Sequence, residues 1–395
     1  MSTAKLYWEL PFALRFEAES ATVTTYGERR ALVLSSTLFY PEGGGQLGDT
    51  GVLRVGDHEL RIVDTQIDEA GTIFHLVDGE PPPELRGSVV GLVDEARRRD
   101  HTAHHTAQHM LSRALLDVAK APTVSARLGL GSCTLDVDRG SLTDAQLLAA
   151  EDLVNDVIRS DVPVRAFFPT PEELAGLDLR RAPKVDTGVR IVDIEGFDVT
   201  PCGGTHCTRT GQIGVVRIAG TERYKGKTRV SFHAAKRALA DARAKERALL
   251  ELAKAFSCGA LDVGLAADKL RAELKDRTDA LARARGELTT HVADAVLAAH
   301  PPDPSGTTVL FLERDEDLAT LRTLAGRLTA RPDVVALCTT PDAASGDWLV
   351  VAQRGASAAF DCGAWLKGKA EAHGGRGGGR AERAEGRLPR GTPVP

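Results

Sequence analysis

Four histidines crowd into nine residues of this 395-residue chain, in the run HTAHHTAQH, although the whole chain has only 11 histidines. They are His101, His104, His105 and His109. Residues four apart share one face of a helix, so either His101 with His105 or His105 with His109 could present two imidazoles to one metal ion. A lone histidine at a helix start is more often only a polar residue, so a second group of ligands is needed to favour a metal site.

The run PCGGTHC supplies that second group, because its Cys202 and His206 are also four residues apart. A thiolate and imidazoles together suit Zn²⁺, a borderline-soft ion. Cys207 is a weaker candidate, since it directly follows His206 and sequence neighbours rarely converge on one ion. The HExxH helix of metalloproteases is absent. The two pairs, both in the middle of the chain, therefore predict a zinc site.

A glycine-rich stretch, FYPEGGGQLGD, precedes both groups and contains Gly43, Gly44, Gly45 and Gln46. Three consecutive glycines are poor material for the interior of a strand or helix. They indicate either a flexible hairpin loop or a loop whose bare backbone lies against a ribose-phosphate chain, with Gln46 offering an amide. No Gly-Lys-Ser/Thr follows, so the stretch is not a P-loop.

Several elements must position these residues, and they predict an α+β multidomain protein. Residues 1–91 alternate short β-branched and apolar runs with turns, which predicts an N-terminal β-barrel. Residues 92–233 mix helical spacing around the histidines with strand-like runs, which predicts an α+β domain. Residues 234–300 read as a helical hairpin, a coiled-coil-like spacer. Residues 301–395, after a linker at 300–306, alternate strands and helices as an α/β domain and end in a Gly/Arg-rich tail.

Composition limits the classes of function. Hydrophobic residues make up 42% of the chain and the net charge is −5, which argues against a general polyanion binder but leaves room for a local basic groove. The sequence predicts no membrane span and no signal peptide, and its six scattered cysteines favour a cytoplasmic protein. Weak candidates for RNA contacts are Arg97, Arg98, Arg99, Arg180, Arg181, Lys225, Lys227, Arg229, Arg376 and Arg380.

Taken together, these motifs resemble the AlaX family, free-standing relatives of the editing domain of alanyl-tRNA synthetase. The resemblance rests on His105-x-x-x-His109, on Cys202-x-x-x-His206 followed by TGQIG, on the loop FYPEGGGQ and on the tail GGRGGGR, all in the order that the family has them. The tail is similar to the glycine-rich signature of the synthetase's C-terminal domain. The resemblance implies that residues 92–233 are a zinc-binding editing domain.

The resemblance also implies particular roles. Zinc would be held by His105, His109, Cys202 and His206, leaving His101 and His104 as bystanders. The glycine motif with Gln46, and Thr123, would lie near the substrate. The reaction implied is hydrolysis of tRNA(Ala) mischarged with serine or glycine, without aminoacylation. By the same resemblance, the C-terminal domain is expected either to read the tRNA body or to support a homodimer, formed through the spacer or the C-terminal domain.

Three other functions remain to be weighed. The chain could be a tRNA-binding module with a structural zinc and no turnover, in which case zinc removal would unfold the domain. Editing of threonyl-tRNA is disfavoured by the glycine motif and the C-terminal signature. A phosphoesterase is disfavoured because its Asp-His-His motif is missing: Asp100-His101 is followed by threonine.

Overall fold

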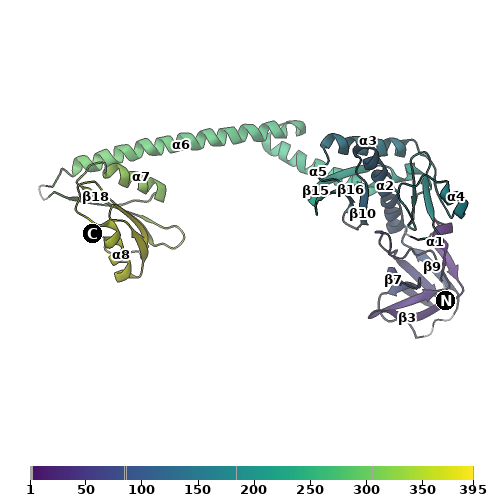
Figure 1. Cartoon of the computed structure of the whole chain (residues 1–395). Helices are drawn as coiled ribbons and strands as arrows, with labels where there is room; N and C mark the ends of the chain where they lie inside the picture. Colours follow the sequence, from purple (N-terminus) through teal and green to yellow (C-terminus); the bar gives the residue numbers. More distant parts are fainter. Residues whose placement is uncertain (1–2, 84, 86, 184, 304–305, 395) are drawn as a thin grey trace. The chain divides into compact units, whose positions relative to one another are not determined.

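The computed structural model describes residues 3–83, 85, 87–183, 185–303 and 306–394. It is a mixed α/β structure with several sheets, and it divides into two compact units, Met1–Leu250 and Glu251–Pro395 (Figure 1). Among the described residues, no helix is both long and apolar enough to cross a bilayer.

The first unit begins with a seven-stranded antiparallel sheet in the order β2-β9-β6-β7-β8-β4-β3. Its strands are β2 (Arg15–Ala18), β3 (Ala21–Tyr26), β4 (Arg29–Leu34), β6 (Gly51–Val55), β7 (His58–Ile67), β8 (Ile73–Val77) and β9 (Val89–Val93). A short parallel pair, β1 (Ala4–Lys5) with β5 (Ser36–Thr37), and helix α1 (Leu6–Glu9) lie beside it. Leu32, Leu53 and Ile62 are fully buried in its core.

The N-terminal region differs from the predicted barrel in one respect. Within the described residues, no pairing joins the outer strands β2 and β3, so the sheet is open and not a closed barrel. The sequence predicts strands through their alternation, but closure depends on hydrogen bonds between the first and last strands, which alternation does not encode.

Helix α2 (Glu95–Ala119) runs through the interior of the first unit and carries all four clustered histidines. The Asp94 carboxylate caps its N-terminus by accepting a hydrogen bond from the N–H of Arg97, over 3.1 Å. Lys120 ends it in the left-handed conformation, with φ of 51°. Every residue from position 101 to 112 is buried, so polar residues of this stretch must find partners inside the protein.

Two further sheets surround α2. One is antiparallel, with strands β10 (Thr123–Leu128), β11 (Cys133–Val137), β16 (Lys227–Ala234) and β15 (Val216–Tyr224) in that order. The other contains β12 (Val164–Phe167), β13 (Ile191–Ile194) and β14 (Asp198–Pro201). Strand β16 alternates strictly, burying Thr228, Val230, Phe232 and Ala234. Helices α3 (Asp144–Arg159) and α4 (Pro171–Ala175) and the 3₁₀ turn η1 (Thr210–Ile213) complete this part.

Helix α5 (Ala235–Phe256) crosses the boundary between the units, and the turn η2 (Ala260–Asp262) precedes the long helix α6 (Val263–Ala299). Helices therefore occupy most of residues 235–299. Antiparallel packing of α5 on α6 stays a prediction. Of the expected linker at 300–306, Pro304 and Ser305 lie outside the described residues.

The second unit holds a five-stranded sheet in the order β17-β18-β19-β21-β20. The strands are β17 (Thr308–Glu313), β18 (Val334–Pro341), β19 (Trp348–Arg354), β20 (Arg376–Gly379) and β21 (Arg383–Leu388), with helices α7 (Leu318–Leu328) and α8 (Cys362–His373). Part of the Gly/Arg-rich tail thus forms the edge strand β20. A side chain on Gly377 would come within 2.9 Å of Leu366, so glycine lets α8 pack closely on this edge.

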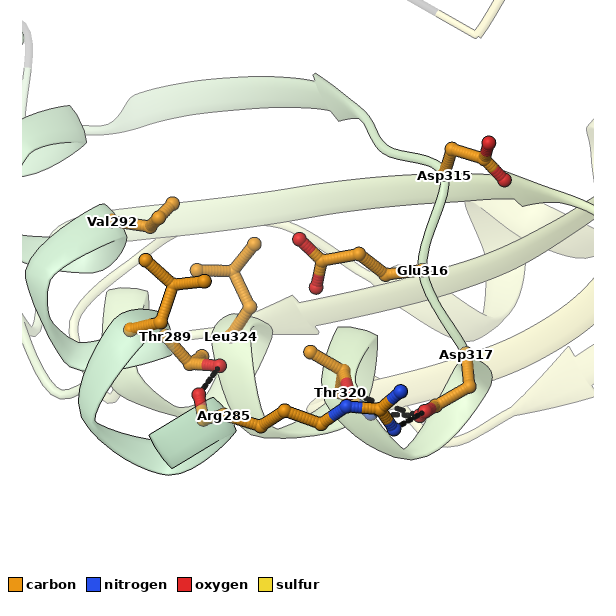
Figure 2. A pocket seen from close by; sticks show the side chains of 9 residues that line it. Arg285, Thr289, Val292, Asp315, Glu316, Asp317, Thr320 and Leu324 are labelled. Carbon is orange, nitrogen blue, oxygen red and sulfur yellow. Dashed lines mark hydrogen bonds and ion pairs between the residues drawn. The ribbon is translucent and has the colours of Figure 1, made fainter. Parts of the chain in front are cut away.

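A hollow of about 410 Å³ lies between α6 and the start of α7 (Figure 2). At one side of it, Arg285 Nη1 is 2.8 Å from Asp317 Oδ2. Asp317 also caps α7, accepting a hydrogen bond from the N–H of Thr320 over 2.8 Å. The same carboxylate therefore fixes the start of α7 and ties it to α6.

Candidate metal centre and substrate pocket

The structure brings His105 and His109 of α2 together with Cys202 and His206, which follow β14. One ligand atom of each lies within 4.8 Å of those of the other three. Nε2 of His105 and Nε2 of His206 are each 3.3 Å from the Cys202 sulfur. In a tetrahedral zinc site, bonds of about 2.0–2.3 Å place the ligand atoms roughly 3.3–3.8 Å apart. The cluster is therefore close to the size that a metal ion needs.

Partners outside the cluster orient two of the imidazoles. Nδ1 of His105 lies 2.7 Å from Oε1 of Gln46, which also accepts from the N–H of Thr205. Nε2 of Gln46 in turn donates to the Thr205 hydroxyl over 2.9 Å. Because Gln46 offers an acceptor here, the Nδ1 of His105 carries the proton and its Nε2 is left free to face the sulfur. Such outer partners raise the affinity of a histidine ligand for metal.

His206 and His109 have analogous neighbours. Nδ1 of His206 is 3.3 Å from the Thr106 hydroxyl, which donates its own proton to the carbonyl oxygen of Thr102. The His206 proton is therefore on Nδ1 as well. Nδ1 of His109 is 3.8 Å from Oδ2 of Asp198 and makes no hydrogen bond. Asp198 is itself held by Arg180, over 2.7 Å.

The electrostatics of the cluster favour neutral imidazoles. Burial, aided by Arg181 and Arg190, lowers the pKa of His105 to about 3. Burial and the neighbouring histidines hold the pKa of His109 and of His206 well below the usual value. Burial raises the pKa of the Cys202 thiol. A bound cation would favour its thiolate, so three neutral nitrogens and one sulfur fit a metal ion of the zinc type.

Two glycines allow the loops to meet at the cluster. A Cβ on Gly204 would lie 2.1 Å from Cε1 of His105, so only glycine fits beside this imidazole. Gly45 has φ of 88°, and its Cβ would lie 2.5 Å from the carbonyl oxygen of Ala126. The carbonyl of Gly45 accepts a hydrogen bond from the N–H of Leu128 over 2.8 Å. The glycine motif is thus fastened to β10, which brings Gln46 to the cluster.

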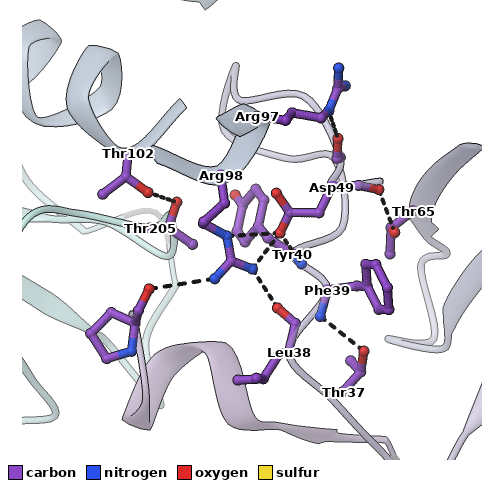
Figure 3. A network of polar contacts seen from close by, with 12 residues as sticks. Thr37, Leu38, Phe39, Tyr40, Asp49, Thr65, Arg97, Arg98, Thr102 and Thr205 are labelled. Carbon is purple, nitrogen blue, oxygen red and sulfur yellow. Dashed lines mark hydrogen bonds and ion pairs between the residues drawn. The ribbon is translucent and has the colours of Figure 1, made fainter. Parts of the chain in front are cut away.

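A buried ion pair holds the other end of the glycine motif (Figure 3). Arg98 of α2 is 2% exposed and Asp49 is 0% exposed, and the guanidinium binds the Asp49 carboxylate through both Nε and Nη2. The same carboxylate accepts from the N–H of Tyr40 over 2.8 Å. Arg97 Nε donates to the carbonyl of Gly48 over 2.9 Å. Arg97 and Arg98 of helix α2 therefore hold the loop that carries Gln46 in place.

The cluster borders a pocket of about 650 Å³. His105 and Cys202 line it, together with Gly43, Gly44, Gly45 and Thr123. Among the described residues, its charged lining is made up of Lys5, Arg180, Arg181, Arg190 and one carboxylate, Glu42. The pocket is therefore locally basic although the chain carries net negative charge.

Comparison with known proteins bears on this site. Residues 189–231, which contain Cys202 and His206, match the family described as the threonyl and alanyl tRNA synthetase second additional domain. Residues 9–97 match the class II (A) tRNA synthetase family. The alanine–tRNA ligase of Halorubrum lacusprofundi is 33% identical over 82% of this chain and 35% of the ligase. The AlaX-L alanyl-tRNA editing protein of Pyrococcus horikoshii is 36% identical over 54% of this chain and 53% of that protein.

The chain is an AlaX-like relative of the alanyl-tRNA synthetases. It spans only about a third of the length of the ligases that it matches, such as 35% in Halorubrum lacusprofundi and 36% in Halobacterium salinarum. The AlaX-like chain therefore corresponds to a part of those enzymes.

The structure separates the remaining candidates of the AlaX-like chain. Thr123 lies in the pocket wall, where its hydroxyl donates to Ser112 over 2.9 Å. His101 is buried with neither ring nitrogen hydrogen-bonded, and His104 Nε2 accepts from the N–H of Ala234 over 3.0 Å. Both lie outside the group of four possible ligands, and their role as bystanders stays a prediction.

Of the basic residues suggested for RNA binding, Arg180 and Arg181 line this pocket and the others do not. Burial contradicts an RNA contact by Arg98. Arg99 pairs with Glu95, Lys227 with Asp138 and Arg229 with Asp136. Lys225 is exposed at the turn between β15 and β16, and Arg376 and Arg380 are exposed in the second unit. Charge runs are more often solvated faces than binding sites, and the basic residues of the pocket come from scattered positions.

Sequence reasoning missed the supporting residues of the site. Gln108 lines the pocket and donates to Ser112 over 2.9 Å, and Asp198 and Arg190 flank the ligands. Only the i, i+4 spacing of Gln108 and Ser112 on α2 could have signalled a pair. The other two act through contacts between segments far apart in the chain, which a single sequence does not reveal.

Proposed function

We propose that the chain is an editing deacylase that hydrolyses serine, and secondarily glycine, from mischarged tRNA(Ala). The observation that carries the proposal is that His105 and Cys202 both belong to the cluster and line the pocket. A purely structural zinc site is closed, whereas a catalytic site borders the space where substrate binds. The relatives include a protein named for alanyl-tRNA editing, which supports the same activity.

In this proposal His105, His109, Cys202 and His206 hold a zinc ion. Such an ion supplies Lewis acidity to an ester or to a water. The chain's own residues do the remaining work. Gln46 and Thr106 keep the protons of His105 and His206 on the outward nitrogens, and the basic wall of the pocket receives the RNA end.

Selection of serine is assigned to Thr123. Its hydroxyl donates its proton to Ser112, so its lone pairs can accept a hydrogen bond from the hydroxyl of the seryl group of the substrate. Alanine has no hydroxyl and leaves this acceptor without its partner, which disfavours its hydrolysis.

The decisive experiment is deacylation of Ser-tRNA(Ala) beside Ala-tRNA(Ala) by the intact protein, by Cys202→Ala and by Cys207→Ala. Cys207 is a matched control, because it is the buried neighbour of His206 but lies outside the cluster. We expect rapid release of serine, slow release of alanine, and loss of activity and zinc only in Cys202→Ala. Absence of hydrolysis with tRNA binding intact would favour the alternative, a tRNA-binding module with a structural metal.

A partner copy is also proposed. Helix α6 carries five leucines that are each more than half exposed: Leu265, Leu270, Leu274, Leu281 and Leu288, at 72%, 54%, 65%, 54% and 61%. Exposed leucines along one long helix are typical of a helix that associates with another chain. Sedimentation equilibrium would test this, since a monomer at micromolar concentration would contradict it. A cytoplasmic location and editing without aminoacylation stay predictions.

A further inference from the structure

Arg190 is a buried cation in the wall of the pocket. It directly precedes β13, and its residue is 6% exposed. Its Nη1 donates to the carbonyl oxygens of Cys202, over 3.0 Å, and Gly204, over 2.9 Å. Among the described residues its Nε and Nη2 have no hydrogen-bond partner, and no carboxylate pairs with it. Half of this guanidinium is therefore engaged with the ligand loop, and the other half is uncommitted.

The two other buried arginines of this region are neutralised by acids. Arg98 binds Asp49, and Arg180 binds Asp198 over 2.7 Å. The absence of such a partner sets Arg190 apart, because burying an unpaired charge is costly. A buried cation without an acidic partner is therefore expected where a bound ligand supplies the negative charge. The ligand expected at Arg190 is therefore an anion that enters the pocket.

Other residues of the pocket lining also favour an anionic ligand. Arg181 is exposed, lines the pocket and donates from Nη2 to the carbonyl of Pro201 over 3.0 Å, and it has no ion-pair partner in the described part of the chain. Lys5 lines it too, with Nζ 4.5 Å from the centre of the Trp8 ring. The carboxylate in the lining, Glu42, accepts a hydrogen bond from Gln66 over 2.9 Å. Among the described residues of the lining, Lys5, Arg181 and Arg190 have no carboxylate partner and Glu42 has no cationic one, so the unpaired charges are positive on balance.

We propose that Arg190, assisted by Arg181, binds the phosphodiester that joins the last two nucleotides of the substrate RNA. The inference rests on the proposed function, in which the ester on the terminal ribose lies beside His105 and Cys202. The first anion reached from that ribose is the phosphodiester on its 5′ side. Arginine is suited to it, because its planar fork donates two parallel hydrogen bonds to phosphate oxygens.

Arg190 would then connect recognition to the ligand loop. The same guanidinium that receives the phosphate also holds the carbonyls on either side of Gly203. A bound phosphate would restrain the arginine and, through it, the backbone that carries the Cys202 thiolate. Arg190 is accordingly assigned both a substrate contact and a positioning role.

A substrate-and-protein double cycle separates these two roles. The substrates are two seryl esters of a short RNA ending in CCA, one with the natural last phosphodiester and one with an uncharged methylphosphonate there. The proteins are the wild type, Arg190→Gln, Arg181→Gln and the control Arg165→Gln, whose exposed side chain pairs with Glu195 outside the pocket. Zinc content is measured in each protein.

We expect the wild type and Arg165→Gln to lose at least 10-fold in kcat/KM on the methylphosphonate, mainly through KM. On the natural ester, kcat/KM of Arg190→Gln should be at least 10-fold below that of the wild type. Replacing the natural ester by the methylphosphonate should lower kcat/KM of this variant by less than a further 2-fold. Arg181→Gln should show the same pattern with a smaller, 3- to 10-fold, effect. Equal slowing of Arg190→Gln on both esters relative to wild type would overturn the phosphate contact and leave only the hold on the loop.

Binding of the same RNA without its ester, followed by fluorescence anisotropy, keeps the inference separate from the proposed function. Binding that weakens on methylphosphonate substitution in the wild type, and not further in Arg190→Gln, supports the phosphate contact even if no ester is hydrolysed. Hydrolysis of serine together with binding that ignores the phosphate charge would overturn the inference and leave the deacylase intact.

Discussion

Nδ1 of His105 donates a hydrogen bond to Oε1 of Gln46 over 2.7 Å, which joins helix α2 to the glycine loop before β6. The two residues are 59 positions apart in the chain. Gln46 is fully buried and offers no atom to the cluster itself. The N-terminal glycine loop contributes no metal ligand, but its Gln46 sets the tautomer of the ligand His105.

Replacing this partner should weaken metal binding without removing any ligand. For Gln46→Ala we expect zinc affinity, measured by competition with a chromogenic chelator, to fall about 10- to 100-fold. Gln212→Ala, an exposed glutamine outside the cluster, is the control and should bind as the wild type does. Unchanged affinity in Gln46→Ala would mean that the hydrogen bond does not orient His105.

The two glycines between Cys202 and His206 should respond differently to a methyl group. A Cβ on Gly204 would meet His105 at 2.1 Å, whereas one on Gly203 would meet nothing within 4 Å. We expect Gly204→Ala to displace the imidazole and lower zinc content and deacylation at least 10-fold, with Gly203→Ala near wild type. Similar losses in both variants would show that the loop needs flexibility and not space.

Thr123 should govern the choice between serine and alanine. In Thr123→Val the acceptor for the serine hydroxyl is gone, so kcat/KM on Ser-tRNA(Ala) should fall about 10- to 100-fold. Hydrolysis of Ala-tRNA(Ala) should change little, which lowers the ratio of the two rates. Thr134→Val is a suitable control, since that residue lies on β11 and outside the pocket. An unchanged ratio would remove Thr123 from the specificity site.

The pair between Arg98 and Asp49 should dominate the stability of the first unit. Arg98→Met leaves the buried Asp49 carboxylate without its cation, and we expect a loss of about 3–5 kcal/mol in the free energy of unfolding, measured with urea. Arg99→Met removes only an exposed pair with Glu95 and should cost less than about 1 kcal/mol. Comparable losses would argue against the ion pair as the cause.

Histidine burial predicts acid sensitivity away from the metal site. Burial lowers the pKa of His75 to about 4, and its ring lies 2.8 Å from the Thr37 hydroxyl. The unfolded chain binds a proton at this residue below about pH 6.5, and the folded chain does so only below about pH 4. The contribution of His75 to the free energy of unfolding is therefore fully present above pH 6.5. It decreases by about 3 kcal/mol as the pH falls to 4.

His75→Gln should flatten that pH dependence. Between pH 7 and pH 4 the free energy of unfolding should fall about 3 kcal/mol less than in the wild type. His58→Gln, at an exposed position on β7, should keep the wild-type slope. If all three proteins lose stability in parallel, other groups carry the acid sensitivity.

Local patterns were sufficient for much of the fold. Apolar spacing located α2, α5 and α6. The i, i+4 pairs, with the histidine register taken from the family resemblance, named four ligands whose ligand atoms lie within 4.8 Å of one another. Whether they bind metal stays a prediction. The open sheet, the strand β20 and the pairing of Arg98 with Asp49 were not predicted, because each depends on partners distant in sequence. Arg98 in particular lies in a basic run that resembles a solvated or RNA-binding face.

The hydrogen bond from the N–H of Leu128 to the carbonyl of Gly45 makes the first ninety residues a structural part of the site. Recombination that replaced this sheet with another would have to bring the same loop, in the same register, to the edge of β10. Otherwise the imidazole that Gln46 steadies would be left without support. Inheritance of the site thus extends to a segment that contributes no ligand to it.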